Sequence, residues 1–268
     1  MILTNLISKI FGKVANREFS PAIQNFINRQ YIKAFDIDMS EFRDFSSYKS
    51  LNELFTREMV KNRDFSQDKI DLISPCDSFV TECGDLDFLD ALQIKGMSYN
   101  IKEFLTDRIS YLDKLENGAF FNLYLSPKDY HRYHAPCDLK IKKAIHVTGK
   151  LYPVNFRYLR KKLNLFIENE RVVLECETME GKAIYMVLVG ALNVGQMVVS
   201  FEPKIRTNTI ADGVFEYSYE NLELKKGECF GNFEMGSTII MFFEKDLVEL
   251  EDLKEKKIKF TDKIASFK

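Results

Sequence analysis

Tryptophan is absent from this chain of 268 residues, and cysteine, proline and histidine are scarce. The five cysteines are an odd number, and no two of them have the Cys-x-x-Cys spacing of a zinc or redox site. Neither a disulfide framework nor a metal site is therefore expected, and a reducing cytoplasm fits the cysteine content best. The formal net charge of −2 lacks the basic excess typical of proteins that bind nucleic acid, so no such partner is expected.

Sequence signals for secretion or membrane spanning are also missing. Lys9 and Lys13 lie among the apolar residues of the N-terminus, which does not fit a secretory signal. Residues 183–201 carry no charge and are long enough to cross a membrane, but Gly190, Gly195 and polar side chains interrupt them. The many β-branched residues in this stretch favour two buried strands joined at the glycines.

What is present is an ordinary globular composition with helices at the N-terminus, since 46% of residues are hydrophobic and 29% are charged. Apolar residues at helical spacing predict helices between Met1 and Phe35, and Ser20-Pro21 is a typical helix start. Such amphipathic helices either pack on their own protein or lie in a membrane interface, and the sequence leaves both readings open.

The rest of the chain predicts an α+β fold with a mostly antiparallel β core behind N-terminal amphipathic helices. A short helix is expected within residues 46–58, and a longer one from Asn100 to Gly118. Strands are expected near Leu72 and over residues 120–125, 140–147, 171–178 and 183–201. The charge-rich tail, residues 244–268, is expected to be a short helix or a solvated end.

Three separate segments supply a serine, a histidine and an aspartate. Ser237 follows Gly236 and precedes an apolar run, Asp77 lies in Ser-Pro-Cys-Asp, and residues 124–136 contain His131 and His134. A serine hydroxyl is a weak nucleophile that needs a base, and a histidine oriented by a carboxylate is the usual one. A serine can also attack the peptide carbonyl before it, and glycine at that position removes a crowding Cβ.

Several motifs of the chain resemble the phosphatidylserine decarboxylases. These are pyruvoyl enzymes that cut themselves before a serine. The matching segments are Tyr-x-Ser-Pro-x-Asp-Tyr-His-Arg-x-His-x-Pro at 124–136, Phe-Thr-Arg at 55–57, Lys-Gly-x-x-Tyr at 95–99, Val-Gly-Ala-x-x-Val-Gly at 189–195 and Gly-Ser-Thr at 236–238. Two positions depart from the family pattern: Met235 replaces a leucine, and Ser78 replaces a glycine whose loss would strain the backbone beside Asp77.

The resemblance implies a self-processing cycle. Ser237 would attack the carbonyl of Gly236, with His134 as base and Asp77 orienting the imidazole. The cut would leave a β subunit, residues 1–236, and an α subunit, residues 237–268, in which Ser237 has become the pyruvoyl cofactor. That group would form a Schiff base with phosphatidylserine and release carbon dioxide to give phosphatidylethanolamine. His131 would assist the decarboxylation stage, and no metal is implied.

A lipid substrate also implies where the protein acts. Residues 1–45 would be a helical membrane-associating segment and residues 46–268 the catalytic domain. The enzyme would sit peripherally on the cytoplasmic side of the cell membrane, on an anionic surface, as a homo-oligomer such as a dimer. Arg57, Lys128 and Arg132 are candidates for the lipid phosphate, although a solvated or ion-paired role is equally open for each.

Two other functions fit the same residues. A serine hydrolase could use Ser237, His134 and Asp77 without cutting itself, but the chain lacks the Gly-x-Ser-x-Gly turn of the commonest such fold at this serine. The chain could also be a non-enzymatic lipid-binding β domain, with a purely structural histidine loop. His146 is expected within a strand, where a structural role is favoured.

Overall fold

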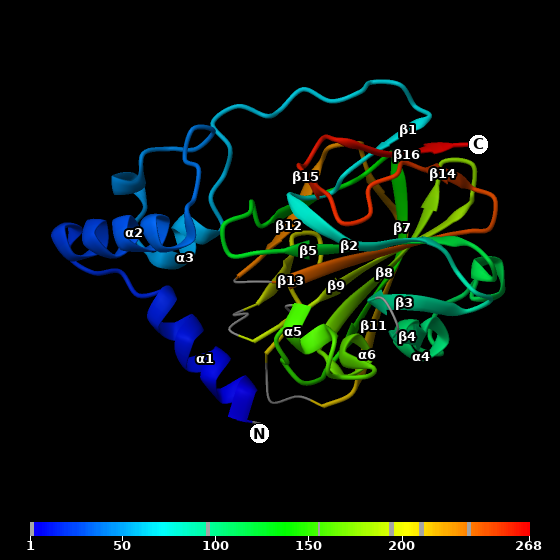
Figure 1. Cartoon of the computed structure of the whole chain (residues 1–268), viewed down its shortest axis with the longest axis horizontal. Coiled ribbons are helices and arrows are strands. Elements are labelled where there is room, and N and C mark those ends of the chain that lie inside the picture. The colour runs from blue at the N-terminus through cyan, green and yellow to red at the C-terminus, as the bar shows by residue number, and fades with distance from the viewer. Residues whose placement is uncertain (1–2, 95–96, 155, 193–195, 209–211, 235–236) are drawn as a thin grey trace.

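The computed structural model describes residues 3–94, 97–154, 156–192, 196–208, 212–234 and 237–268. The fold is α+β, as predicted: antiparallel sheets form the body of the protein, and the first helices lie to one side of them (Figure 1). The helices are α1 (Leu3–Ala15), α2 (Pro21–Phe35), α3 (Leu51–Phe55), α4 (Ile101–Leu105), α5 (Phe156–Leu159) and α6 (Leu165–Glu168), with short 3-10 turns η1 (Phe45–Ser47) and η2 (Asp113–Leu115).

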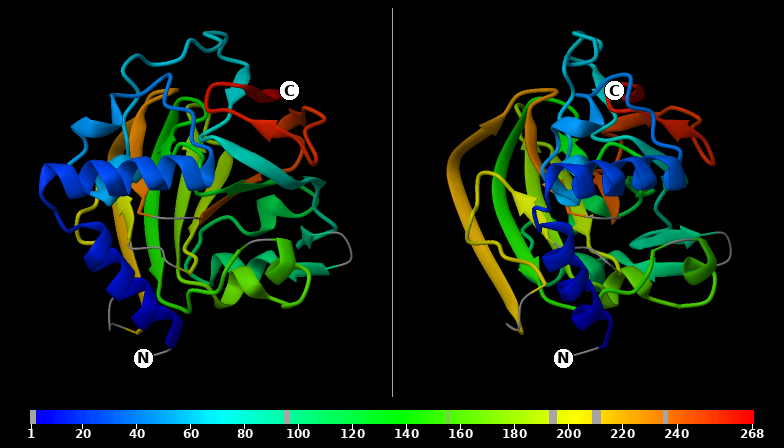
Figure 2. Two further views of the ribbon diagram at one scale, coloured as in Figure 1. Left: turned by 60° about the vertical axis from the view of Figure 1, so that its left-hand side comes forward. Right: turned by 90° about the vertical axis from the view of Figure 1, so that its left-hand side faces the viewer.

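An eight-stranded antiparallel sheet is the scaffold of the molecule, and Figure 2 shows how strongly it curves. Its strands, in spatial order, are β11 (Val214–Leu224), β7 (Leu139–Val147), β8 (Arg171–Thr178), β9 (Ala183–Val189), β13 (Ser237–Phe243), β5 (Ala119–Leu125), β2 (Ser78–Asp85) and β15 (Lys257–Ile258). Every residue of β9 and β13 is buried, which explains why both strands read as continuous apolar runs.

Three smaller sheets complete the fold. Their strands are β1 (Asp71–Ile73), β16 (Lys263–Phe267) and β14 (Val248–Leu250) in one, β10 (Met197–Val199), β12 (Cys229–Phe233) and β6 (Arg132–His134) in the second, and β3 (Asp90–Ile94) with β4 (Met97–Asn100) in the third. In the second sheet β12 lies so close to β10 that a Cβ on Gly231 would lie only 1.9 Å from the Val198 carbonyl oxygen. Glycine at 231 is therefore required for this pairing.

The N-terminal helices begin and end near the predicted places. Ser20 occupies the N-cap position of α2, and Pro21 is its first residue. The burial of α2 is unusual, because Gln24 and Asn28 are buried while Ile23 and Phe26 are exposed. Asn28 donates hydrogen bonds to the main-chain carbonyls of Phe45 and Tyr48, at 3.0 Å each, so a polar face of α2 holds it to the following turn.

The helix expected from Asn100 to Gly118 is much shorter than predicted. Asn100 does cap it, accepting from the Lys102 N–H at 3.1 Å, but α4 ends at Leu105. Thr106 adopts a positive φ of 72°, which a right-handed helix cannot include. Beyond it the Ser110 N–H donates to Glu175 of β8 at 2.7 Å, so a tertiary bond replaces the helical one.

The expectation for the tail, residues 244–268, was wrong. The tail forms β14, β15 and β16, and Ile264 and Ala265 are fully buried. Residues 257–260 alternate lysine with buried Ile258 and Phe260, a period of two that the abundance of charge conceals. The uncharged stretch 183–201 does contain two strands, β9 and β10, and they belong to different sheets.

Candidate active site around Ser237

Ser237 begins β13, at the centre of the large sheet. It lies opposite Leu125, the last residue of β5, and its neighbour Thr238 lies opposite Val189 of β9. Ser237 is fully buried, and its Oγ has no hydrogen-bond partner among the described residues. A buried hydroxyl without a partner costs about 1–3 kcal/mol, a feature that Ser237 shares with Thr238 and Ser78 among the described residues. The predicted cut follows Gly236, which with Met235 lies outside the described residues.

The loop that carries both histidines leaves β5 next to Ser237. Its first turn is closed by Asp129, whose carboxylate accepts from the N–H and the Oγ of Ser126 at 2.6 and 2.7 Å. The loop then passes beside the segment leading to Ser237, because the Phe233 N–H donates to the His131 carbonyl at 2.9 Å. The strand register therefore brings His131 and Ser237 into one region of the fold.

The Phe-Thr-Arg segment forms hydrogen bonds with this loop, which explains why the two motifs occur together. Arg57 Nη2 donates to the carbonyls of Lys128 and Asp129 at 2.8 and 3.3 Å. The Thr56 carbonyl accepts from Arg132 Nε at 3.0 Å, and Glu58 pairs with the same guanidinium at 2.8 Å. Arg132 is thus engaged in a structural ion pair, one of the two roles the sequence left open.

His131 is fully buried and its ring packs against that of Phe55 at a tilt of 43°, with centroids 3.9 Å apart. Its Nδ1 lies 2.8 Å from the Asp129 carbonyl, and because a carbonyl only accepts, we assign the proton to Nδ1. Nε2 is then a lone-pair acceptor, and it has no partner among the described residues. Burial, together with the charge of Arg57, lowers the pKa of His131 to about 3, so the ring is neutral at physiological pH.

His134 has the same tautomer, fixed by a main-chain carbonyl from a more distant segment. Its Nδ1 lies 2.9 Å from the Gly227 carbonyl, so Nδ1 donates and Nε2 accepts from the Tyr130 hydroxyl at 3.1 Å. Gly227 adopts a φ of +80°, a conformation that favours glycine, and the turn around it sets the direction of this carbonyl. Burial lowers the pKa of His134 to about 4, so this imidazole is also an uncharged base.

Asp77 lies near His134, but its hydrogen bonds go elsewhere. Its carboxylate forms two hydrogen bonds with Arg63, at 2.5 and 3.0 Å, and accepts from the Phe260 N–H at 2.7 Å. The ring of Phe260 stacks on His134 with centroids 3.7 Å apart, so one residue contacts two of the three members of the predicted triad. Arg63 is held in turn by Glu41, at 2.7 and 2.8 Å.

The expected hydrogen bond between Asp77 and His134 does not occur among the residues that the structure describes, nor does one between His134 and Ser237. The Gly227 carbonyl fixes the tautomer instead, and the cationic fork of Arg63 is the stronger partner for a carboxylate. The strain expected at Ser78 is also not found, because Ser78 is not among the described residues with positive φ. Sequence reasoning missed Arg63, Tyr130, Phe260 and Gly227.

Other segments singled out in the sequence lie partly outside the description. Lys95, Gly96 and residues 193–195 of the two glycine motifs are among the residues that the structure leaves out. His146 lies in β7 and pairs with buried Glu170 at 2.8 Å, an environment separate from the contacts of His131 and His134. Within the described part of the chain, no group of three His, Cys, Asp or Glu side chains could hold a metal ion.

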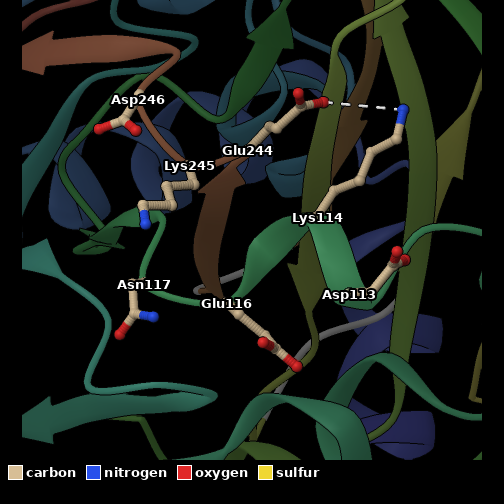
Figure 3. A pocket seen from close by; sticks show the side chains of 7 residues that line it. All are labelled: Asp113, Lys114, Glu116, Asn117, Glu244, Lys245 and Asp246. Atoms are coloured by element: carbon tan, nitrogen blue, oxygen red, sulfur yellow. Dashed lines mark ion pairs between the residues drawn. The ribbon is translucent and has the colours of Figure 1, made fainter.

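A surface hollow of about 310 Å³ lies at the far end of β13 from Ser237 (Figure 3). Its walls carry charged side chains of both signs, including Glu244, which pairs with Lys114 at 3.8 Å. Seven residues at about 3.3 Å each separate the two ends of the strand by roughly 20 Å. The hollow is therefore not part of the Ser237 site.

Comparison with known proteins gives a consistent result along the whole chain. The family model described as phosphatidylserine decarboxylase matches residues 51–266. A phosphatidylserine decarboxylase proenzyme of Helicobacter pylori (strain Shi470) is 48% identical over 267 residues, covering 99% of this chain and 98% of that protein. Proteins of the same description from Campylobacter jejuni and Idiomarina loihiensis are 44% and 37% identical, covering 96% and 92% of this chain, and 97% and 87% of their own lengths.

Proposed function

This chain belongs to the phosphatidylserine decarboxylase family and is a decarboxylase, and from that premise we propose that it makes its own cofactor by cutting the peptide bond before Ser237. The single observation that carries this proposal is the place of the buried, unpartnered Ser237 hydroxyl, which begins the central strand just beyond the segment that bonds to the His131 carbonyl. The description of the relatives as proenzymes supports it, because a proenzyme must be processed.

The first step is attack of Ser237 Oγ on the carbonyl of Gly236, which exchanges an amide for an ester. His134 accepts the hydroxyl proton at Nε2, since Gly227 holds its other nitrogen protonated. The Tyr130 hydroxyl bonds to this Nε2 at 3.1 Å. During the attack it must therefore either move away from Nε2 or pass the proton from Ser237 to it. Asp77 acts by its negative charge, which favours the imidazolium, and by its bond to the Phe260 N–H, which holds the stacked ring against His134.

The second step divides the chain. Loss of the Cα proton at 237 expels the carboxylate of residue 236, and water then replaces the nitrogen at 237, which leaves as ammonia. A ketone remains at the new terminus. The surroundings fit such a group, because the position is buried and the nearby loop offers an unpartnered imidazole nitrogen at His131.

The pyruvoyl group would supply an electron-accepting carbonyl that draws the electron pair from the departing carboxylate of phosphatidylserine. His131 is the group of this chain proposed to move a proton at that stage. Its Nε2 is unpaired, its ring is fixed by Phe55, and its pKa of about 3 keeps it neutral until a proton is delivered to it.

Mass spectrometry of freshly made protein tests the proposal. We expect two fragments, residues 1–236 and 237–268, the shorter without a free N-terminal amine and labelled by borohydride in the presence of substrate. The fragments should co-elute in gel filtration and separate only in denaturant, because β13 is paired on both edges by β9 and β5. A single uncut chain in active enzyme would instead favour a serine hydrolase, and an inactive one a lipid-binding domain.

The N-terminal helices provide a surface suited to lipid. We infer that residues 1–45 hold the enzyme at an anionic membrane surface, on the cytoplasmic side of the cell membrane. The exposed apolar residues Ile10, Val14, Ile23 and Phe26 are between 52% and 64% accessible, and basic Lys13, Arg29 and Lys33 are exposed on the same two helices. None of the described helices has the length and apolar character needed to span a bilayer.

Replacing Ile23 and Phe26 together by serine should weaken binding to vesicles of phosphatidylglycerol and phosphatidylethanolamine at least tenfold. Burying each apolar side chain contributes about 1.5–3 kcal/mol, and neither side chain is buried in the protein. Vesicle sedimentation measures the change. Phe88→Ser is the matched control, since Phe88 is 55% exposed and lies outside the N-terminal helices. Equal losses in both proteins would argue against a specific role for α2.

A further inference from the structure

Two of the arginines whose side chains the structure describes are almost completely buried, and they differ in one respect. Arg171 is 3% exposed and all three of its nitrogens donate to main-chain carbonyls, those of Phe104, Ile167, Asn169 and Glu103, at 2.6 to 3.3 Å. Arg57 is 2% exposed, but only its Nη2 has partners. Its Nε and Nη1 have none among the described residues, so three N–H donors of a buried cation are unused.

A buried cation is costly without a compensating charge, so this difference needs an explanation. No carboxylate among the described residues forms a salt bridge with Arg57, although four of the described arginines do form such pairs: Arg43, Arg63, Arg108 and Arg132. The ring of Phe42 covers one face of the Arg57 guanidinium, 4.4 Å from its centroid. The N–H groups on Nε and Nη1 of Arg57 therefore have no acceptor among the described residues.

We propose that Arg57 is the receptor for the phosphodiester of the substrate's head group, an assignment that rests on the proposed decarboxylation at position 237. Arg57 is held in position by the loop that carries both histidines. It donates to the Asp129 carbonyl, and the same carbonyl accepts the Nδ1 proton of His131. Two unpartnered nitrogens of Arg57 and the unpartnered Nε2 of His131 thus belong to side chains anchored on one peptide group.

The head group of phosphatidylserine carries two anions, and the chemistry distinguishes them. The carboxylate loses its charge as carbon dioxide departs, so an ion pair to it would stabilise the ground state more than the transition state and slow the reaction. The phosphodiester keeps its charge throughout, and binding it lowers KM without opposing the chemical step. Guanidinium is well suited to phosphate oxygens, because its charge-assisted hydrogen bonds are among the strong ones in proteins.

Arg57→Lys tests the proposal because it keeps the charge but replaces the planar fork of five N–H donors by a single ammonium group. For soluble dihexanoylphosphatidylserine we expect KM to rise about 10- to 100-fold and kcat to change less than about threefold. The affinity for dihexanoylphosphatidylethanolamine, which keeps the phosphate and lacks the carboxylate, should fall by the same factor. This binding is measured by calorimetry on the Ser237→Ala chain with and without Arg57→Lys, so it does not depend on self-cleavage.

Arg171→Lys is the matched control, since it alters an equally buried arginine; it should lower the temperature of unfolding but leave KM and lipid affinity unchanged. Unchanged phosphatidylethanolamine affinity in the Arg57→Lys protein would overturn the proposal and assign Arg57 to the carboxylate or to the fold. A fall in kcat with constant KM would overturn it as well.

A second measurement does not require any change at Arg57. Methylating the phosphodiester of dihexanoylphosphatidylethanolamine to the uncharged triester should weaken its binding to the Ser237→Ala chain about 10- to 100-fold. Equal affinity for the two lipids would contradict a phosphate receptor, even if every Arg57 variant failed to fold. Failure of the pyruvoyl mechanism would be recognised separately: active wild-type enzyme would then have no ketone at residue 237.

Discussion

Ser237→Ala is expected to leave the chain uncut and to lower decarboxylase activity by at least about 10⁴-fold, the scale of loss when a nucleophile is removed. The substitution removes one oxygen that has no hydrogen-bond partner among the described residues, so the fold should tolerate it. Without that oxygen no ester can form before residue 237, and no carbonyl can replace the amine there. Intact mass and a decarboxylation assay on the same preparation measure both effects.

The next residue provides a close control. Thr238 is also buried, also lies in β13 and also has a hydroxyl without a described partner. Thr238→Val removes that hydroxyl at nearly constant volume, and the chain should still divide and remain active. Two fragments from the Ser237→Ala protein would refute self-cleavage by this serine, whereas an uncut Thr238→Val chain would show only that β13 is intolerant of change.

Much of the fold could be predicted because local patterns determined it. The start of α2 at Ser20-Pro21 and the strand over residues 171–178 depend on neighbouring residues, so caps and periodicity identify them. The helix predicted to reach Gly118 failed because Glu175, far along the chain, accepts the Ser110 N–H. The strands of the tail were missed because alternating lysines raise the charge of a segment whose other face is buried.

The candidate residues of the site could be named from the sequence, but their partners could not. Ser237, His131 and His134 are visible as motif residues, and the fold places His131 beside the segment that leads to Ser237. Apart from Tyr130, the partners of Asp77 and His134 come from segments without any motif. Phe260 is 183 residues beyond Asp77, and Gly227 is 93 residues beyond His134. Such segments come together only through the strand pairing of the sheets. The register of that pairing cannot be predicted from one sequence.

The contacts of Asp77 alter how its role is understood. The Asp77 carboxylate bonds to Arg63 and to the Phe260 N–H, and the Nδ1–H of His134 bonds to the Gly227 carbonyl in place of Asp77. The negative charge of Asp77 is still close to His134, because Phe260 bonds to Asp77 through its N–H and stacks on the imidazole with its ring. The proposed role of Asp77 in self-cleavage therefore depends on charge and position, and it extends the functional unit to Arg63 and Glu41.

The two histidines of the loop should separate the two reactions. His134→Gln is expected to leave the chain uncut, or to slow cutting by about 10²–10⁴-fold, because it removes the only uncharged base proposed for Ser237. His131→Gln should be cut normally yet lose decarboxylase activity by a similar factor, because the ketone forms but the proton donor is gone. Cutting is followed by mass spectrometry over time, and decarboxylation by carbon dioxide release.

The third described histidine makes this comparison decisive. His146 is as buried as the other two and has a strong partner in Glu170, so His146→Gln should lower the free energy of unfolding without affecting cutting or decarboxylation in folded protein. If loss of any buried imidazole merely disturbed the fold, all three variants would behave alike. The reverse pattern, with His131→Gln uncut and His134→Gln cut but inactive, would exchange the two roles. That result would also fit the register, since the His131 carbonyl bonds to Phe233 at the end of β12 nearest Ser237, whereas His134 pairs with Cys229 at its start.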